Sequence, residues 1–206
     1  MERAGRARSV RCGVTWSRHE LLKRTSFGVG ALAVGGASAH AVMAAASTPS
    51  VQQDKKILNF ALSLERLQAG FYRTAIDHGA LKGELREFAE VVGENERAHV
   101  ASLTQALGPD AKPAPAFDFA AAKAAPRTFA TTASMLEDAG VYAYNGQAAN
   151  LTRATLAAAA EIVSVEGRHA AWIRDILGLE PAPHAVDVGA DAVAIIGQLK
   201  ANGLLR

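Results

Sequence analysis

Cysteine, long apolar runs and an excess of either charge are all scarce in this sequence of 206 residues. Because its only cysteine is Cys12, the chain from Ser47 onward contains no disulfide, thiolate metal site or cysteine nucleophile. From Ser47 onward there are 15 basic and 18 acidic residues, so no basic surface for nucleic acid is expected. No stretch after Pro49 is apolar for long enough to span a membrane.

The first 46 residues have the three parts of an export signal. Residues 1–24 hold seven Lys and Arg, and a weakly apolar, Gly/Ala-rich run follows at 27–46. Three alanines before Ser47 predict cleavage there, and a weaker Ala-His-Ala site lies at 39–41. A membrane anchor is the alternative, but glycine and alanine make a poor span. We therefore expect export to the periplasm or the exterior, with no stable membrane span after signal removal.

One segment of this leader indicates an export route. Residues 17–23, Ser-Arg-His-Glu-Leu-Leu-Lys, resemble the twin-arginine signal S-R-R-x-F-L-K. His19 stands where that signal has its second arginine. The sequence thus predicts a twin-arginine-like signal, and a general secretion route remains the alternative.

Proline divides the rest of the chain into helical stretches. It occurs only at positions 49, 109, 113, 115, 126, 181 and 183, which leaves 50–108 and 127–180 free of it. Proline inside a helix costs about 3 kcal/mol, and alanine, the best helix former, is abundant in both stretches. Period-two alternation is missing, so the sequence predicts an all-α fold. The expected helices run from Ser50 to about His78, from Lys82 to Leu107, from Pro126 to 146–149, from Asn150 or Thr152 to Leu177 and, more weakly, over 190–202.

The motif E-x-x-H occurs twice, as Glu96 with His99 and as Glu166 with His169. Residues i and i+3 lie on one face of a helix, so each motif presents a carboxylate and an imidazole to one point. Both motifs fall within the apolar, core-facing stripe of their helix. An unpaired carboxylate is costly there, so the placement favours pairing with a metal or another cation.

The first and third helices each add one glutamate to this stripe, Glu65 and Glu137. In a hairpin, Glu65 shares a level with the first motif only if the turn lies near residue 81, between Gly79 and Gly83. In the second hairpin, Glu137 shares a level with the second motif only if the turn lies near residue 152, beside the predicted helix caps Asn150 and Thr152. The linker over 108–126 is long enough to return along the whole bundle. The six side chains are therefore predicted to converge on one point.

Two single glutamates and two E-x-x-H motifs are the ligand set of ferritin-like di-iron and di-manganese bundles. Residues 57–65 and 160–170 are similar to exported bacterial ferritin-like domain proteins, and the resemblance covers about residues 50–180. It implies a ferritin-like four-helix bundle of two antiparallel hairpins joined by a long crossover, with a short C-terminal helix. The expected organisation is an export signal at 1–46, the bundle at 47–180 and a tail at 181–206.

The resemblance also implies a centre of two iron or manganese ions. The implied roles are terminal binding by Glu65 and Glu137, bridging of both ions by Glu96 and Glu166, and binding of one ion each by His99 and His169. Four carboxylates balance two divalent ions, which a low-dielectric core tolerates better than bare charge. Oxygen-rich ligation with a few imidazoles suits iron or manganese, and the choice between them stays open.

Seven other polar side chains lie near the predicted ligands in the sequence or on the same helices. Three of them lie off the stripe and are expected to be solvated: Glu94, Asn95 and Asp138. His78 lies at a helix end and His184 in a proline-flanked loop, and neither is expected to be a ligand. Tyr72 and Tyr144 lie within the stripes. We expect them to be core residues, with a hydrogen bond to a ligand carboxylate as the alternative.

Such a centre is typical of redox chemistry with oxygen or peroxide, of the ferroxidase, peroxidase or catalase type. A rubrerythrin-like peroxidase usually carries a Cys-rich iron module, which this sequence lacks. The alternative function is that of a non-enzymatic metal-binding or structural stress protein of the cell envelope. Storage inside a ferritin shell would require self-assembly, and homo-oligomerisation stays open.

Overall fold

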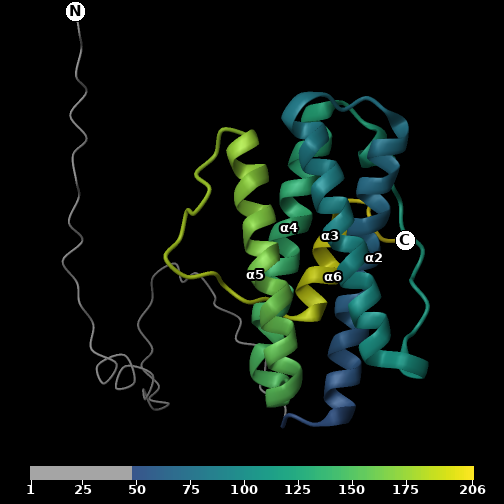
Figure 1. Cartoon of the computed structure of the whole chain (residues 1–206), viewed down its shortest axis with the longest axis vertical. Coiled ribbons are helices and arrows are strands. Elements are labelled where there is room, and N and C mark those ends of the chain that lie inside the picture. Colours follow the sequence, from purple (N-terminus) through teal and green to yellow (C-terminus); the bar gives the residue numbers. More distant parts are fainter. Residues whose placement is uncertain (1–47) are drawn as a thin grey trace, which may run out of the picture. The chain divides into compact units, whose positions relative to one another are not determined.

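The computed structural model describes residues 48–206, and this part of the chain is all-helical (Figure 1). The predicted export signal, with Cys12 and His19, lies outside the described residues. The helices are α2 (Val51–His78), α3 (Gly83–Leu107), α4 (Pro126–Gln147), α5 (Arg153–Ile176) and α6 (Ala192–Ala201). Single 3-10 turns cover Gly108–Asp110, Ala120–Lys123 and Ala148–Asn150. The predicted all-α class, with four long helices and a short C-terminal one, is confirmed.

The ends of α2 follow the capping signals in the sequence. The Ser50 hydroxyl accepts a hydrogen bond of 3.2 Å from the Gln53 backbone N–H, which otherwise has no partner in the first turn. Gly79 ends the helix with a φ of 74°, a conformation that glycine adopts without a steric penalty. Helix α4 starts at Pro126, where the missing N–H of proline costs nothing.

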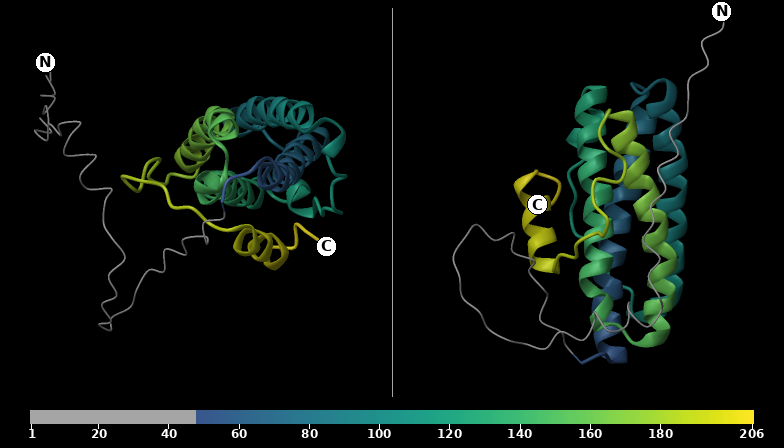
Figure 2. Two further views of the ribbon diagram at one scale, coloured as in Figure 1. Left: turned by 90° about the horizontal axis from the view of Figure 1, so that it is seen from below. Right: turned by 90° about the vertical axis from the view of Figure 1, so that its left-hand side faces the viewer.

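The four long helices form two hairpins, α2 with α3 and α4 with α5. Figure 2 shows them side by side as a bundle, with α6 on its outside. The crossover between the hairpins runs along α2. The side chains of Asn59 and Arg66 donate hydrogen bonds of 3.0 and 2.6 Å to the backbone carbonyls of Asp110 and Lys112. The connection is the single long crossover that the sequence predicts.

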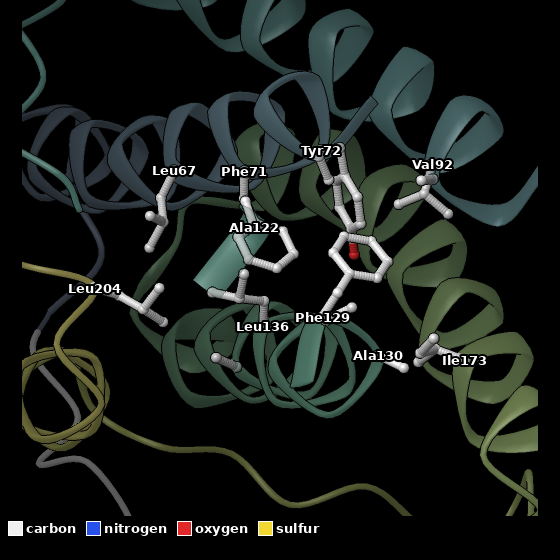
Figure 3. Packing of buried hydrophobic residues seen from close by; sticks show 14 of the residues in the cluster. Leu67, Phe71, Tyr72, Val92, Ala122, Phe129, Ala130, Leu136, Ile173 and Leu204 are labelled. Carbon is white, nitrogen blue, oxygen red and sulfur yellow. The ribbon is translucent and has the colours of Figure 1, made fainter. Parts of the chain in front are cut away.

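Two apolar clusters fill the bundle and leave a polar layer between them. The first contains the stacked rings of Phe71 and Phe129, which Figure 3 shows beside Tyr72. The second includes Leu103 and Leu107 of α3, which lie about two and three turns beyond Glu96 on the same helix. Burying such a side chain contributes about 1.5–3 kcal/mol, so the two clusters hold the four helices at a fixed spacing around the polar layer.

The C-terminal segment packs onto this bundle. Ile195, Leu199 and Leu204 are buried in the first apolar cluster. The backbone N–H of Asp118, in the crossover, donates a hydrogen bond of 3.0 Å to the carbonyl of Leu204. None of the described helices is long and apolar enough to cross a membrane.

Helix α5 begins with an unusual cap. Its N-cap residue, Thr152, makes no side-chain cap of its own. Asp54 of α2 instead accepts hydrogen bonds from the Thr152 backbone N–H at 2.9 Å and from the Thr155 hydroxyl at 2.6 Å. Burial raises the pKa of Asp54, but a hydrogen bond from the Thr152 hydroxyl, together with the two just named, outweighs it, so the net pKa is lowered. The first helix of the bundle thus fixes the start of the last long one.

Candidate metal centre

Each long helix contributes one deeply buried carboxylate to the polar layer, and α3 and α5 add a histidine each. Glu96, Glu137 and Glu166 have no exposed surface, and Glu65 is 1% exposed. His99 and His169 are 9% and 4% exposed. The structure therefore buries all six residues that the sequence places in the apolar stripes of the four helices.

The six side chains form two overlapping groups of four. In each group one ligand atom per residue lies within 4.8 Å of the others. The members of the first group are Glu65, Glu96, His99 and Glu166, and those of the second are Glu96, Glu137, Glu166 and His169. Glu96 and Glu166 belong to both groups. The arrangement is compatible with a centre of two metal ions that share two carboxylates.

Both histidines turn the same ring nitrogen toward the carboxylates. His99 Nδ1 lies 3.2 Å from Glu65 Oε2 and 3.2 Å from Glu166 Oε1. His169 Nδ1 lies 3.1 Å from Glu96 Oε1 and 3.1 Å from Glu137 Oε2. In each histidine, Nδ1 is therefore the ring nitrogen that would face a metal ion bound by these oxygens.

Hydroxyl and amide groups hold the two outer carboxylates. The Tyr144 hydroxyl donates to Glu65 Oε1 at 2.6 Å, and the Tyr72 hydroxyl donates to Glu137 Oε1 at 2.5 Å. Gln68 Nε2 donates to Glu137 Oε1 at 3.2 Å and to Glu166 at 3.4 Å. Both tyrosines therefore hydrogen-bond to a predicted ligand carboxylate, which was the alternative expectation from the sequence.

The expectation that the Asn95 side chain is solvated is wrong. Its amide lies 2.9 Å from His169 Nε2, the nitrogen that faces away from the carboxylates. The hydrogen bond fixes the rotation of the ring and therefore the direction of Nδ1. Gln68 was not predicted from the sequence, although its spacing of three residues from Glu65 places it on the same face of α2.

The electrostatics reflect four acids in a small buried space. Burial and the negative charge of Glu65 raise the pKa of Glu96 well above its usual value. Burial and the negative charges of Glu96 and Glu65 do the same for the pKa of Glu166. Burial also raises the pKa of Glu65, but His99 and the Tyr144 hydroxyl outweigh it, so the net pKa is lowered. Burial lowers the pKa of His99, but the carboxylates of Glu166, Glu65 and Glu96 outweigh it and raise the pKa to about 12.

Two observations test whether these residues fit a metal pair. Both oxygens of Glu96 and Oε1 of Glu166 are buried without a hydrogen bond, although an unsatisfied buried group is costly. The space around Glu166 also depends on Gly140, because a Cβ there would lie less than 3 Å from Glu166 Oε2. These three oxygens belong to the two carboxylates that both groups share, and each lies 3.1–3.4 Å from the Nδ1 atom of a histidine. The donor set, with buried oxygens that lack hydrogen bonds, is compatible with bound metal ions.

The remaining polar candidates lie outside the cluster. Glu94 is exposed and pairs with Arg97. Asp138 is not fully solvated as expected, because it is half-buried in an ion pair with Arg174. His78, at the end of α2, and His184 join neither group of potential ligands.

A family model described as ferritin-like domain matches residues 53–179 of the chain. The match includes all six clustered residues and the four long helices, apart from the first two residues of α2. No curated protein matches the chain significantly.

Proposed function

The chain belongs to the ferritin-like domain family, and we propose that its buried cluster binds two iron or manganese ions. One observation carries the proposal. The two carboxylates shared by both ligand groups, Glu96 and Glu166, are those whose buried oxygens lack hydrogen bonds. Two divalent ions would occupy these lone pairs and neutralise the four acids of the cluster.

Each residue has a distinct role in this proposal. Glu65 and His99 would hold one ion, Glu137 and His169 would hold the other, and Glu96 and Glu166, which belong to both groups, would be shared between them. The list of proposed ligands is Glu65, Glu96, His99, Glu137, Glu166 and His169. Iron and manganese are favoured because carboxylate oxygens and neutral imidazoles suit these cations.

We further propose redox chemistry with oxygen or peroxide, of the ferroxidase, peroxidase or catalase type. Iron or manganese, when bound, would supply the one-electron steps that protein side chains alone do not provide. The chain contributes orientation and exclusion of water. Tyr72, Gln68 and Tyr144 fix the outer carboxylates, and an apolar cluster lies on each side of the polar layer. A non-enzymatic metal-binding or structural stress protein of the cell envelope is the alternative.

Export to the periplasm or the exterior is also part of the proposal. It is supported by the basic, apolar and small-residue parts of residues 1–46. The near match to the twin-arginine signal favours that route, with general secretion as the alternative because of His19.

Metal stoichiometry tests the site. Purified protein is stripped with a chelator and then titrated with Mn(II) in buffer and with Fe(II) in the absence of oxygen. We expect two equivalents per chain, and fewer in Glu96→Ala and Glu166→Ala, each of which removes a bridging carboxylate. Glu94→Ala is the matched control on α3, because that side chain is exposed and lies outside the cluster. Equal losses in all three variants, or no binding by the native chain, would overturn the proposal.

Consumption assays then decide between the two functions. Metal-loaded protein is supplied with oxygen or hydrogen peroxide, and the loss of each is followed against the metal-free protein and the Glu96→Ala variant. Repeated turnover that requires both ions supports a redox enzyme. A chain that binds two ions tightly and consumes neither oxidant is a metal-binding protein instead.

A further inference from the structure

A hollow of about 340 Å³ opens between the second half of α3 and the first half of α5. Leu58 of α2 and Tyr144 of α4 also line it, so all four long helices contribute. Pockets of this volume are in the range that holds small organic ligands. The hollow lies outside the cluster of proposed metal ligands, none of which lines it.

The lining of this hollow is mostly apolar, with Ser102, Thr155 and Glu161 as its polar members besides the Tyr144 side chain. Leu103, Ala159 and Ile162 are buried, and Ala158 lies at the exposed side. No lysine, arginine or histidine lines the hollow, and the one acid that does, Glu161, is exposed. An anionic ligand would therefore find no counter-charge, whereas a neutral apolar ligand would gain from leaving water.

Tyr144 connects the hollow with the metal cluster. Its hydroxyl donates the hydrogen bond of 2.6 Å to Glu65 Oε1, and the same side chain lines the hollow. A molecule in the hollow would be separated from a proposed ligand carboxylate by one side chain.

The opposite outer carboxylate is enclosed differently. Glu137 is bound by Tyr72, which has no exposed surface. Edge-on contacts with Phe71, Phe88 and Phe129 surround the Tyr72 ring, and Figure 3 shows it between Phe71, Phe129 and Val92. The Glu137 end is thus closed by aromatic rings, while the Glu65 end adjoins a hollow.

We propose that this hollow binds a neutral, largely apolar small molecule and holds it against the Glu65 end of the cluster. Binding of the molecule depends only on the hollow. Its closeness to a metal ion rests on the proposed function. The inference names a class of organic ligand, and hence of candidate substrate or reductant, for a centre otherwise expected to meet only oxygen or peroxide.

The probe for the binding step is 1-fluoronaphthalene, which is neutral, apolar and visible by fluorine NMR. It is titrated with the complete chain loaded with Zn(II). We expect saturable binding that weakens at least tenfold in Ala158→Phe, because the new ring fills the hollow. Ala157→Phe is the matched control, since Ala157 is exposed on the same helix and does not line the hollow. Naphthalene-1-sulfonate should bind more weakly than the neutral probe.

Several results would overturn the binding step. These are the absence of saturable binding, equal affinity in both variants, or tighter binding of the sulfonate. If the chain self-associates and only Ala158→Phe makes it monomeric, a second copy covers the hollow and the proposal fails. Circular dichroism checks that Ala158→Phe is folded, and Ala106→Leu on α3 fills the hollow from the other side if it is not.

The second step is tested by replacing Zn(II) with paramagnetic Mn(II). We expect strong broadening of the bound fluorine signal in the Mn(II) protein, absent with Zn(II) and lost in Ala158→Phe. Binding without broadening, in protein shown to hold two Mn(II) ions, would overturn the closeness to the metal. Probe binding by a chain that takes up no metal would support the hollow, overturn the closeness and reject the proposed function separately.

Discussion

Gly140 of α4 should be essential for the position of Glu166. It is buried, and a Cβ at this position would lie less than 3 Å from Glu166 Oε2 and 3.3 Å from Glu166 Cδ. The carboxylate would have to move by about 1 Å to reach an ordinary contact of 3.4 Å. Such a shift breaks the hydrogen bond from Gln68, which is already 3.4 Å long, and displaces a proposed bridging ligand.

Two effects of opposite sign decide the stability of Gly140→Ala. Alanine favours a helix over glycine by about 0.8–1 kcal/mol. Overpacking a filled core costs about 1–3 kcal/mol. The metal-free variant should therefore lie between no change and a loss of about 2 kcal/mol in the free energy of unfolding. Its affinity for the second metal ion should fall at least tenfold, because a 1 Å displacement removes a shared ligand.

Gly167→Ala is the matched control. Gly167 lies in α5 beside Glu166, and nothing lies within 4 Å of a Cβ placed there. This variant should gain up to about 1 kcal/mol from helix propensity and keep both ions. Urea unfolding without metal and Mn(II) titration of both variants provide the two readouts. Equal gains in stability and native affinity in both would refute the steric argument.

Three further predictions follow from other parts of the chain. Asp54→Asn should lose about 1–2 kcal/mol at pH 7, because a charged acceptor that caps α5 is removed. Since the pKa of Asp54 is lowered on folding, its contribution is present above pH 3.8 and is lost as the pH falls through the folded pKa. Urea unfolding between pH 3 and 7 should show the difference from the native chain shrinking in acid, and a constant difference would contradict it. Mn(II) at 100 times its dissociation constant should stabilise the protein by about 2.7 kcal/mol. A thermal melt of Glu65→Ala/Glu137→Ala should show no such gain, and an equal gain would place the metal elsewhere. The exported protein should begin near Ser47, which N-terminal sequencing of cell fractions tests; an intact cytoplasmic chain would contradict it, and His19→Arg would then show whether the missing arginine is the cause.

The helices and the cluster could be predicted because each produces a recognisable pattern within a single sequence segment. A capping serine, a C-terminal glycine and the absence of proline fix the ends of α2 to within one residue. A glutamate in an apolar stripe breaks the helical pattern at one position, so Glu65 stands out without knowledge of its neighbours. That the ligands of the two helices in each hairpin lie at the same level then follows from the number of residues between each ligand and the turn.

Side-chain contacts between helices could not be predicted, because the sequence of one helix does not show them. Asn95 lies about 100° around α3 from Glu96, which a single helix presents as a surface position. It reaches His169 only because α3 and α5 are rotated toward each other at this level. The same reason applies to Asp54, whose partner lies 98 residues away in the chain. Rotation between helices depends on the shapes of both surfaces, and one stripe does not determine it.

The composition of the polar layer argues against a purely structural role. A bundle selected only for stability would place apolar side chains where Glu96 and Glu166 lie without exposed surface, since well-packed apolar groups are often more stabilising than buried ions. Gly140 adds a further cost of about 1 kcal/mol in helix propensity, at the one position where its missing side chain makes room for Glu166. Three buried oxygens without hydrogen bonds complete the pattern. Each of these features destabilises the metal-free bundle, and bound cations would reverse the charge and hydrogen-bonding costs together.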